Sequence, residues 1–344
     1  MTTVVRHKAY GEEGYVYVVD WEQKKVLHRL QLPPPQVRHD RTLGPRGITF
    51  LNGLCYVANA DTLFGYSADW ELKHTISHPW FAHIHEIAAT DETIWVTSTG
   101  CDAVLEVDEQ SRVVSEYFLG EQPDEVRNAV GISPRRIDRR RDYRRDLWQK
   151  EVDVAHPNAV SIHSGRPYVT LWKQGAVIAL NPVELIWKGS DLSGCHSGRP
   201  IDNGKTLLIA GSYQRALIVI DVPSGRIVNE IELCPEDGYA LASPSPLQKL
   251  QQALRHWGPG ASWVRSHVLS RFPYAWRPRP APPFPGFTRG IAVWGPDRAI
   301  VGTTPAGLTV VNLVTGVPED RMRLDDRVAY SVFSISIDPR TSAR

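Results

Sequence analysis

Histidine residues open three segments of this 344-residue chain that share one pattern. The segments are His83-Ile84-His85-Glu86-Ile87, His156-Pro157-Asn158-Ala159-Val160 and His196-Ser197-Gly198-Arg199. In a strand, residues two apart point to the same face, so His83 projects with His85. Neutral imidazole suits Fe, Mn, Zn, Ni or Cu, whereas Ca²⁺ prefers oxygen ligands. We therefore expect a divalent transition-metal cofactor bound by a histidine cluster, namely His83, His85, His156 and His196.

Arginine occupies the matching place in two further segments, Arg46-Gly47-Ile48 and Arg289-Gly290-Ile291. A guanidinium group can bind a carboxylate, sulfate or phosphate through two parallel hydrogen bonds, and the following glycine lets the backbone approach a ligand closely. We expect Arg46 and Arg289 to bind the acid group of a small anionic substrate, with Arg199 as a third substrate-binding residue. The alternative is that the two arginines bond carbonyl groups between neighbouring segments and act as structural clamps.

The expected catalytic residues are Asn158, which would orient the substrate, and Tyr330, which would transfer a proton. Tyr330 stands at the head of an alternating run near the end of the chain. Aligning the segments places His83, His156 and His196 at one level. The next level holds His85, Asn158, Arg46 and Arg289.

The elements that must position these residues are short strands in a repeat. Arg46 precedes Tyr56 by ten residues, and the same interval separates His85 from Trp95. Turn residues divide the strands, as Asn52-Gly53 does. Repeats of roughly 40 residues made of short strands are typical of a β-propeller, in which the inner strands begin around one central channel.

The ends of the chain supply a sixth repeat. Tyr330–Ile337 alternates like an inner strand, and Thr3–Arg6, Tyr15–Asp20 and Lys25–Leu30 supply its three partners. The sequence thus predicts an all-β, six-bladed β-propeller over residues 1–344, with four-stranded blades, closed by the C-terminal strand joining the N-terminal blade. Closure removes the free sheet edges that invite aggregation.

Two insertions do not fit the blades. Residues 121–155 and 234–286 connect the end of one blade to the start of the next, so we expect them to cover the channel mouth. The first holds an arginine-rich run, 134–148, that predicts a short helix, which either binds an anionic partner or forms local ion pairs. A protein partner on this covering face is a further alternative.

Composition excludes several classes of partner. The net charge is +1, which gives no bias toward nucleic acid, and no apolar run approaches the ~20 residues of a membrane helix. The first residues lack the apolar core of a signal peptide, so we expect a cytoplasmic protein. The four cysteines have no disulfide or zinc-finger spacing. Cys195 and His196 are adjacent and point apart in a strand, which disfavours a cysteine nucleophile.

Three motifs carry a resemblance to a known family: 155–160 (AHPNAV), 195–200 (CHSGRP) and 285–292 (PGFTRGIA). They resemble the H-x-N-G/A, P-H-S-x-R and G-F-T-R-G-L signatures of an uncharacterised bacterial family of propeller-like proteins. The chain departs from these signatures at Ala159 and Gly198. The resemblance implies a propeller and site residues at His156, Asn158, His196, Arg199 and Arg289, but no reaction.

The residues together favour a metal-dependent enzyme acting on a small anionic substrate in the channel. Lyase, isomerase, hydrolase and oxygenase chemistry all stay open, because a fold does not choose a reaction. The alternative is a non-catalytic propeller that binds a ligand or serves as a protein-interaction scaffold.

Overall fold

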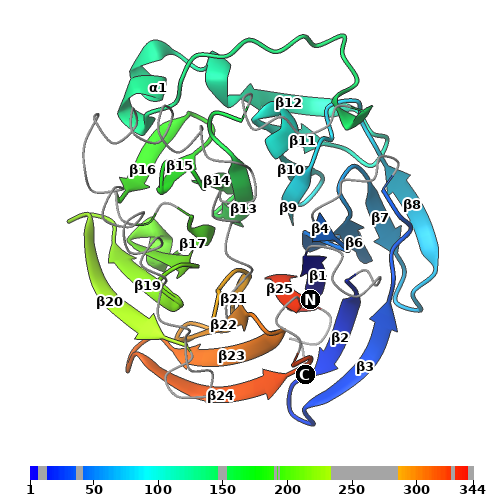
Figure 1. The fold of residues 1–344 in the computed structure, drawn as a ribbon, viewed down its shortest axis with the longest axis vertical. Helices are drawn as coiled ribbons and strands as arrows, with labels where there is room; N and C mark the ends of the chain where they lie inside the picture. Colours follow the sequence, from blue (N-terminus) through cyan, green and yellow to red (C-terminus); the bar gives the residue numbers. More distant parts are fainter. Residues whose placement is uncertain are drawn as a thin grey trace, which may run out of the picture.

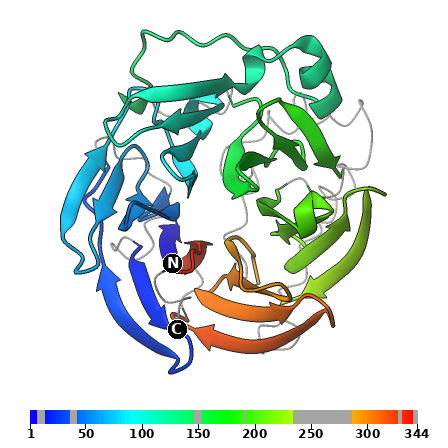
Figure 2. The same ribbon diagram turned by 180° about the vertical axis from the view of Figure 1, so that it is seen from behind.

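A computed structural model describes residues 1–6, 14–35, 42–145, 153–189, 192, 194–233, 286–326 and 330–339. These residues form six antiparallel sheets set around one axis, a six-bladed β-propeller (Figures 1 and 2). The predicted fold class is therefore confirmed.

Five blades follow one another along the chain, and each runs from an innermost to an outermost strand. Blade 1 comprises β5 (Ile48–Leu51), β6 (Leu54–Ala58), β7 (Leu63–Tyr66) and β8 (Leu72–Ile76). Blade 2 comprises β9 (Ile84–Ala89), β10 (Ile94–Ser98), β11 (Ala103–Val107) and β12 (Val113–Phe118). Blade 3 comprises β13 (Pro157–His163), β14 (Arg166–Leu171), β15 (Ala176–Ala179) and β16 (Glu184–Lys188). Blade 4 comprises β17 (His196–Ile201), β18 (Thr206–Gly211), β19 (Ala216–Asp221) and β20 (Arg226–Glu232). Blade 5 comprises β21 (Ile291–Val293), β22 (Arg298–Thr303), β23 (Gly307–Asn312) and β24 (Val317–Arg323).

The sixth, closure blade joins the two ends of the described chain. Its strands are β25 (Tyr330–Ser334), β1 (Thr2–Arg6), β2 (Val16–Asp20) and β3 (Lys25–Leu30), and β4 (Thr42–Leu43) also pairs with β1. Strand β25 is antiparallel to β1, with Tyr330 opposite Val5 (Figure 1). The predicted closure is confirmed, although the strand ends at Ser334 and not at Ile337.

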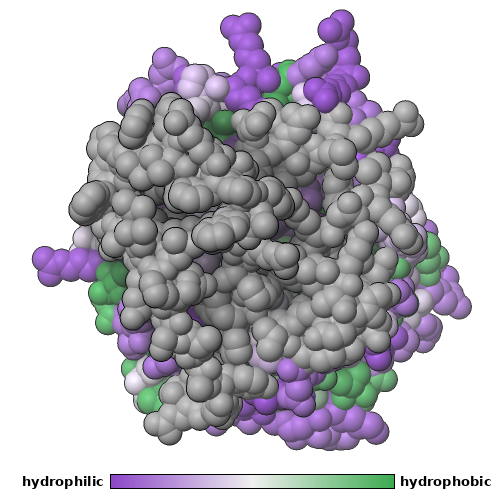
Figure 3. Space-filling view, in the orientation of Figure 1, coloured by the Kyte–Doolittle hydropathy of each residue, from purple (hydrophilic) through white to green (hydrophobic). Residues whose placement is uncertain are grey.

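The hydrophobic core lies between the blades. Because consecutive strand residues point to opposite faces, each blade packs against both of its neighbours. In β10, Val96 packs in the cluster shared with blade 1, whereas Trp95 packs in the cluster shared with blade 3. Hydrophilic side chains project from the rim of the face in Figure 3.

Residues 121–145 of the first insertion lie on the outer rim, whereas the prediction placed them over the channel mouth (Figure 1). Residues 146–152 lie outside the described residues, and Asp153–Ala155 lead into β13. Helix α1 (Asp124–Val130) packs against β16, and the segment after it runs along the edge of the ring beside β12 (Figure 1). The buried side chains of Ile137 and Tyr143 join the core cluster of blade 2, which holds the segment there.

In residues 134–145, the described part of the run 134–148, the predicted helix does not form, apart from a short 3₁₀ turn at Tyr143–Arg145. The helix forms earlier, where Asp124 and Glu125 occupy the first turn and Gly131 ends it in the left-handed conformation. The arginines form local ion pairs, such as Arg139 with Glu121 and Arg144 with Asp142. The second insertion, from residue 234 to 285, lies outside the described residues. No helix in the described ranges is long and apolar enough to cross a membrane.

Candidate functional site

One position of the inner strands carries five of the predicted site residues. In blades 1 and 5 the backbone N–H of Arg46 donates to Ala58 O, and that of Arg289 donates equivalently to Gly302 O. In blades 2 and 4 the Nδ1 atoms of His85 and His196 each lie 3.0 Å from a carbonyl oxygen two residues earlier. Blade 3 supplies Asn158 at this position. We call these residues the channel ring: Arg46, His85, Asn158, His196 and Arg289.

This register corrects the level predicted for His196, which aligns with His85 and not with His83. The residue two before the ring position has a positive φ in four blades: Gly44 (116°), His83 (58°), His156 (55°) and Gly194 (94°). Glycine adopts this left-handed backbone without strain, whereas a residue with a Cβ does not. His83 and His156 thus hold a strained conformation where two other blades have glycine.

β-Bulges next to the channel ring aim its side chains. The pairing of β9 with β10 shifts between Val96 and Ser98, and that of β13 with β14 shifts between Pro157 and Ala159. A bulge adds one residue to one strand and redirects side chains there. Glu86, beside His85, is only 1% exposed and contacts residues of other blades, so it does not orient a histidine.

Three histidine rings lie in contact. The ring centroids of His83 and His85 are 4.8 Å apart, and those of His85 and His156 are 4.9 Å apart. The Nδ1 atom of His83 is 3.0 Å from the hydroxyl of Thr99. Burial, and then the nearby histidines and Arg46, hold the pKa of His85 well below its usual range, so its ring is neutral at pH 7.

His156 pairs with a buried carboxylate, because its Nδ1 lies 2.8 Å from Asp153 Oδ2. Lys173 Nζ is 3.3 Å from the same oxygen. Burial disfavours the charge on Asp153, but the hydrogen bond from His156 and the charge of Lys173 outweigh it and lower the pKa of this carboxyl. The pair fixes the orientation of the imidazole, as the aspartate of a catalytic dyad does.

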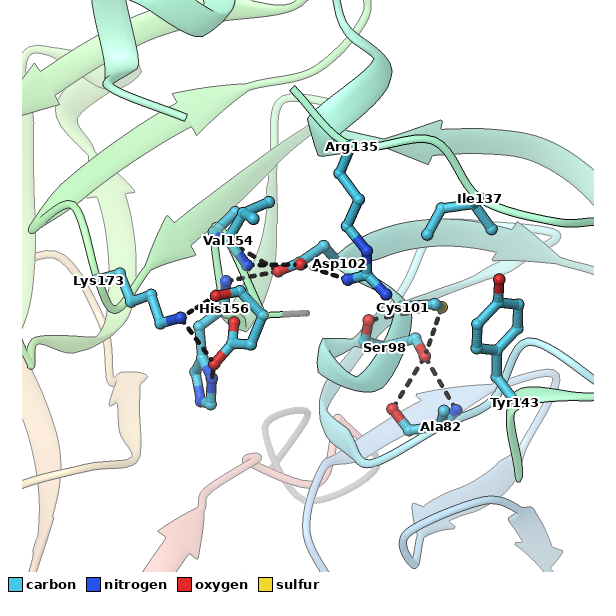
Figure 4. Close-up of polar contacts among 12 residues, drawn as sticks. Ala82, Ser98, Cys101, Asp102, Arg135, Ile137, Tyr143, Val154, His156 and Lys173 are labelled. Atoms are coloured by element: carbon cyan, nitrogen blue, oxygen red, sulfur yellow. Dashed lines mark hydrogen bonds and ion pairs between the residues drawn. The ribbon is translucent and has the colours of Figure 1, made fainter. Parts of the chain in front are cut away.

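A second carboxylate holds the backbone that carries this pair (Figure 4). Asp102 accepts hydrogen bonds from the backbone N–H groups of Val154, Ala155 and His156 at 2.7–2.9 Å. Arg135 Nη1 lies 2.7 Å from the Asp102 carboxylate and offsets its charge. The turn after β10 therefore positions the start of β13.

His196 sits in a further polar group between blades 4 and 5. Its Nδ1 lies 2.7 Å from Ser212 Oγ, and the Ser212 hydroxyl donates to Thr288 O at 2.5 Å. Its ring packs against Phe287 at a centroid distance of 5.8 Å.

The two ring arginines differ in their contacts. Arg46 is 1% exposed, and its Nη1 donates to Ile84 O in blade 2 at 2.6 Å, as expected for a clamp. The Arg289 guanidinium lies 4.5 Å from the ring centroid of Phe333 in the closure blade. The glycines that follow them serve strand packing, since a Cβ on Gly47 would lie 2.4 Å from Ile87 N.

Arg199 is used between blades, which corrects its predicted role in substrate binding. Its Nη1 donates to Val160 O at 2.9 Å, and its Nε donates to Ile291 O at 3.1 Å. Its Nη2 lies 3.8 Å from Glu86 Oε2, and Ser334 Oγ donates to Glu86 Oε1 at 2.6 Å. Glu86, Arg199 and Ser334 thus link blades 2, 4 and 6 across the channel. Burial raises the pKa of Glu86 to about 7.

Tyr330 is not brought to the histidines. Its side chain is fully buried in an apolar cluster with Val5, Leu308 and Val332. Phe333 of the closure blade does contact the histidines: its ring centroid lies 5.7 Å from that of His85. Asp102 and Asp153 were missed from the sequence, where the available signal was a carboxylate beside an apolar strand. Glu86 was singled out only as a neighbour of His85 and not as a link to Arg199 and Ser334.

No group of three or more His, Cys, Asp or Glu residues in the described part of the chain is arranged to hold a metal ion. Of the four predicted ligands, His83 and His156 each contact His85, and His196 lies on blade 4 against Phe287.

Comparison with known proteins supports the fold alone. No protein-family model matches the sequence, and a search of curated proteins finds no match. A protein of unknown function from Bacteroides caccae is 10% identical over 97% of both chains, with a TM-score of 0.54. A chain of the nidogen/laminin complex is 9% identical over 97% of both chains, with a TM-score of 0.52. The resemblance to a bacterial family drawn from three motifs stays a prediction.

Proposed function

We propose that the channel ring binds a small anionic molecule and that His156 transfers a proton to or from it. The observation that carries the proposal is the convergence of Arg46, Arg289 and three other polar side chains from five blades at one level. These five side chains include two guanidinium groups and no carboxylate, so their field favours a negative ligand. Arg46 uses one Nη atom to donate to Ile84 O, so it is held in place between blades 1 and 2.

The Asp153–His156 pair supplies the acid–base group. Because Nδ1 faces the carboxylate, that nitrogen carries the proton, and Nε2 of the neutral ring has the lone pair that accepts a proton. Asp153 then stabilises the imidazolium that forms. The strained left-handed backbone at His156 supports this role, since such strain is concentrated at functional sites. A pair of this kind serves a lyase, an isomerase or a hydrolase.

The test is binding of inorganic phosphate and acetate, measured by calorimetry, to the whole protein. Arg289→Lys keeps the charge but loses the planar two-point contact, so binding should weaken by about 1–3 kcal/mol. Arg298→Lys is the matched control, because Arg298 lies in the same blade and pairs with Glu319 on the outside. Equal affinities in the wild type and Arg289→Lys would favour the scaffold alternative.

A transition metal bound by His83, His85 and His156 is the second candidate. The observation that favours it is that Nδ1 of each ring faces an oxygen atom, which directs metal binding to Nε2. The three rings would have to reorient, because they do not form a ligand set as they stand. A bound metal would supply Lewis-acid chemistry at the channel ring.

Elemental analysis of protein expressed in metal-supplemented medium tests this candidate. We expect close to one ion per chain in the wild type and much less in His85→Gln. The exposed His74→Gln variant is the control. Wild-type protein without metal would refute this candidate and leave the acid–base proposal standing.

A further inference from the structure

Two histidines of the channel ring present a hydrogen-bond acceptor to the channel. His85 Nδ1 lies 3.0 Å from His83 O, and a carbonyl oxygen can only accept, so Nδ1 carries the hydrogen. The same holds for His196, whose Nδ1 lies 3.0 Å from Gly194 O. Ser212 cannot reverse this assignment, since its hydroxyl hydrogen is donated to Thr288 O. In the neutral state, Nε2 of both rings is therefore an acceptor.

Asn158, between these two histidines in the ring, adds a third acceptor. Its Nδ2 donates to Cys195 O at 2.9 Å, which fixes the orientation of the amide and directs Oδ1 away from that carbonyl. The residue is 2% exposed, and Oδ1 has no hydrogen-bond partner within the ranges that the structure describes. A buried acceptor without a donor is costly, so a bound group that donates to Oδ1 would be strongly favoured.

The channel ring thus has two chemically different sides. Blades 5 and 1 offer guanidinium donors, and blades 2 to 4 offer the acceptors His85 Nε2, Asn158 Oδ1 and His196 Nε2. A simple anion, which has only acceptors, would satisfy the first side and bring no donor to Asn158 Oδ1, which has no partner among the described residues. A ligand that fits both sides carries an acid group at one end and hydrogen-bond donors at the other.

Hydroxyl groups suit the acceptor side better than an ammonium group. A cation there would face two guanidinium groups around the ring. Of the nearby carboxylates, Asp153 already pairs through Oδ2 with the cation Lys173 and with His156, and Glu86 is held by Ser334 and Arg199. A hydroxyl donates one hydrogen bond and brings no charge.

We propose that the ligand of the channel ring is a hydroxylated acid, a carboxylate or phosphate ester whose free hydroxyl donates to Asn158 Oδ1. The arginine end of this assignment rests on the proposed function. The hydroxyl end rests on Asn158 and on the hydrogen positions of His85 and His196.

The test compares acids that differ only in their hydroxyl groups: glycolate with acetate, gluconate with hexanoate, and glycerol 3-phosphate with propyl phosphate. Calorimetry on the wild-type protein should show the hydroxylated member of a pair binding at least about tenfold more tightly. Equal affinities within every pair would overturn the inference and leave anion binding intact. Binding of none of the six would overturn both proposals.

Two variants locate the effect. Asn158→Leu should abolish the preference for the hydroxylated acid while the affinity for its partner changes little. Thr288→Val is the matched control, since Thr288 also has a buried hydroxyl without a partner among the described residues but lies outside the channel ring. It should keep the preference. A preference that survives in folded Asn158→Leu would contradict the role of Oδ1.

Discussion

The left-handed backbone at His83 predicts that a glycine variant at this position is more stable than an alanine variant, which is the reverse of the usual order of stability in a strand. In an ordinary strand, glycine is less stable than alanine by about 0.5–1 kcal/mol, because its unfolded chain has more freedom. At a φ of 58° the alanine Cβ costs about 1–2 kcal/mol that glycine avoids. The two terms have opposite signs, so His83→Gly should be more stable than His83→Ala by about 0.5–1 kcal/mol. Both variants lack the imidazole, so the loss of its contacts with Thr99 and His85 cancels in the comparison.

Urea unfolding of the two variants measures this difference, with the same pair of substitutions at His74 as the control. His74 lies in β8 on the surface, and its φ is not positive. There His74→Gly should be less stable than His74→Ala by about 0.5–1 kcal/mol. The same order of stabilities at both positions would refute the claim that the backbone at His83 is strained.

Three further predictions concern buried charge and closure. The folded-state pKa of Glu86 is about 7, which is above its value in the unfolded chain. Between about pH 4.5 and 7 the folded protein therefore binds one more proton than the unfolded chain. As pH rises through this range, the free energy of unfolding of the wild type should fall by about 3 kcal/mol relative to that of Glu86→Gln. Parallel urea titrations at pH 4.5 and 8 check this, and a constant difference would contradict it. Asp102→Ala should lower the free energy of unfolding by at least about 3 kcal/mol, because three backbone N–H groups and Arg135 lose their buried partner. Amide hydrogen exchange should rise most at residues 154–156. Unchanged exchange there would show that Asp102 does not hold this backbone. Ending the chain before Tyr330 removes the inner strand of the closure blade and should abolish cooperative thermal unfolding by circular dichroism; a sharp transition near the wild-type midpoint would show that closure is not required.

The blades could be predicted from the sequence because their signals are local. Apolar and polar residues alternate with a period of two in each strand, and turn residues separate one strand from the next. Closure followed from counting, since an inner strand was missing at one end and spare at the other. The ring positions of Arg46, His85, Asn158 and Arg289 followed from the constant interval between each site residue and its second strand.

The features that could not be predicted depend on the length of one hairpin and on contacts between distant blades. Strand β18 ends at Gly211, 15 residues after His196, whereas β10 ends at Ser98, 13 residues after His85. The longer hairpin of blade 4 therefore shifted the predicted level of His196. Tyr330 was misplaced as well, because the closure-blade side chain that contacts His85 is Phe333, three residues further along the chain. The pairing of Glu86 with Arg199 joins blades 2 and 4, and no local pattern marks a contact 113 residues apart in the chain.

The link among Glu86, Arg199 and Ser334 has a kinetic consequence. These buried side chains meet across the axis and tie together alternate blades that share no strand pairing. A molecule at the channel ring could not pass through them without separating a buried ion pair, which is a costly event. Entry and departure must therefore use the same opening. If the proposed site turns over a substrate, its product would have to leave by that opening before the next substrate could enter.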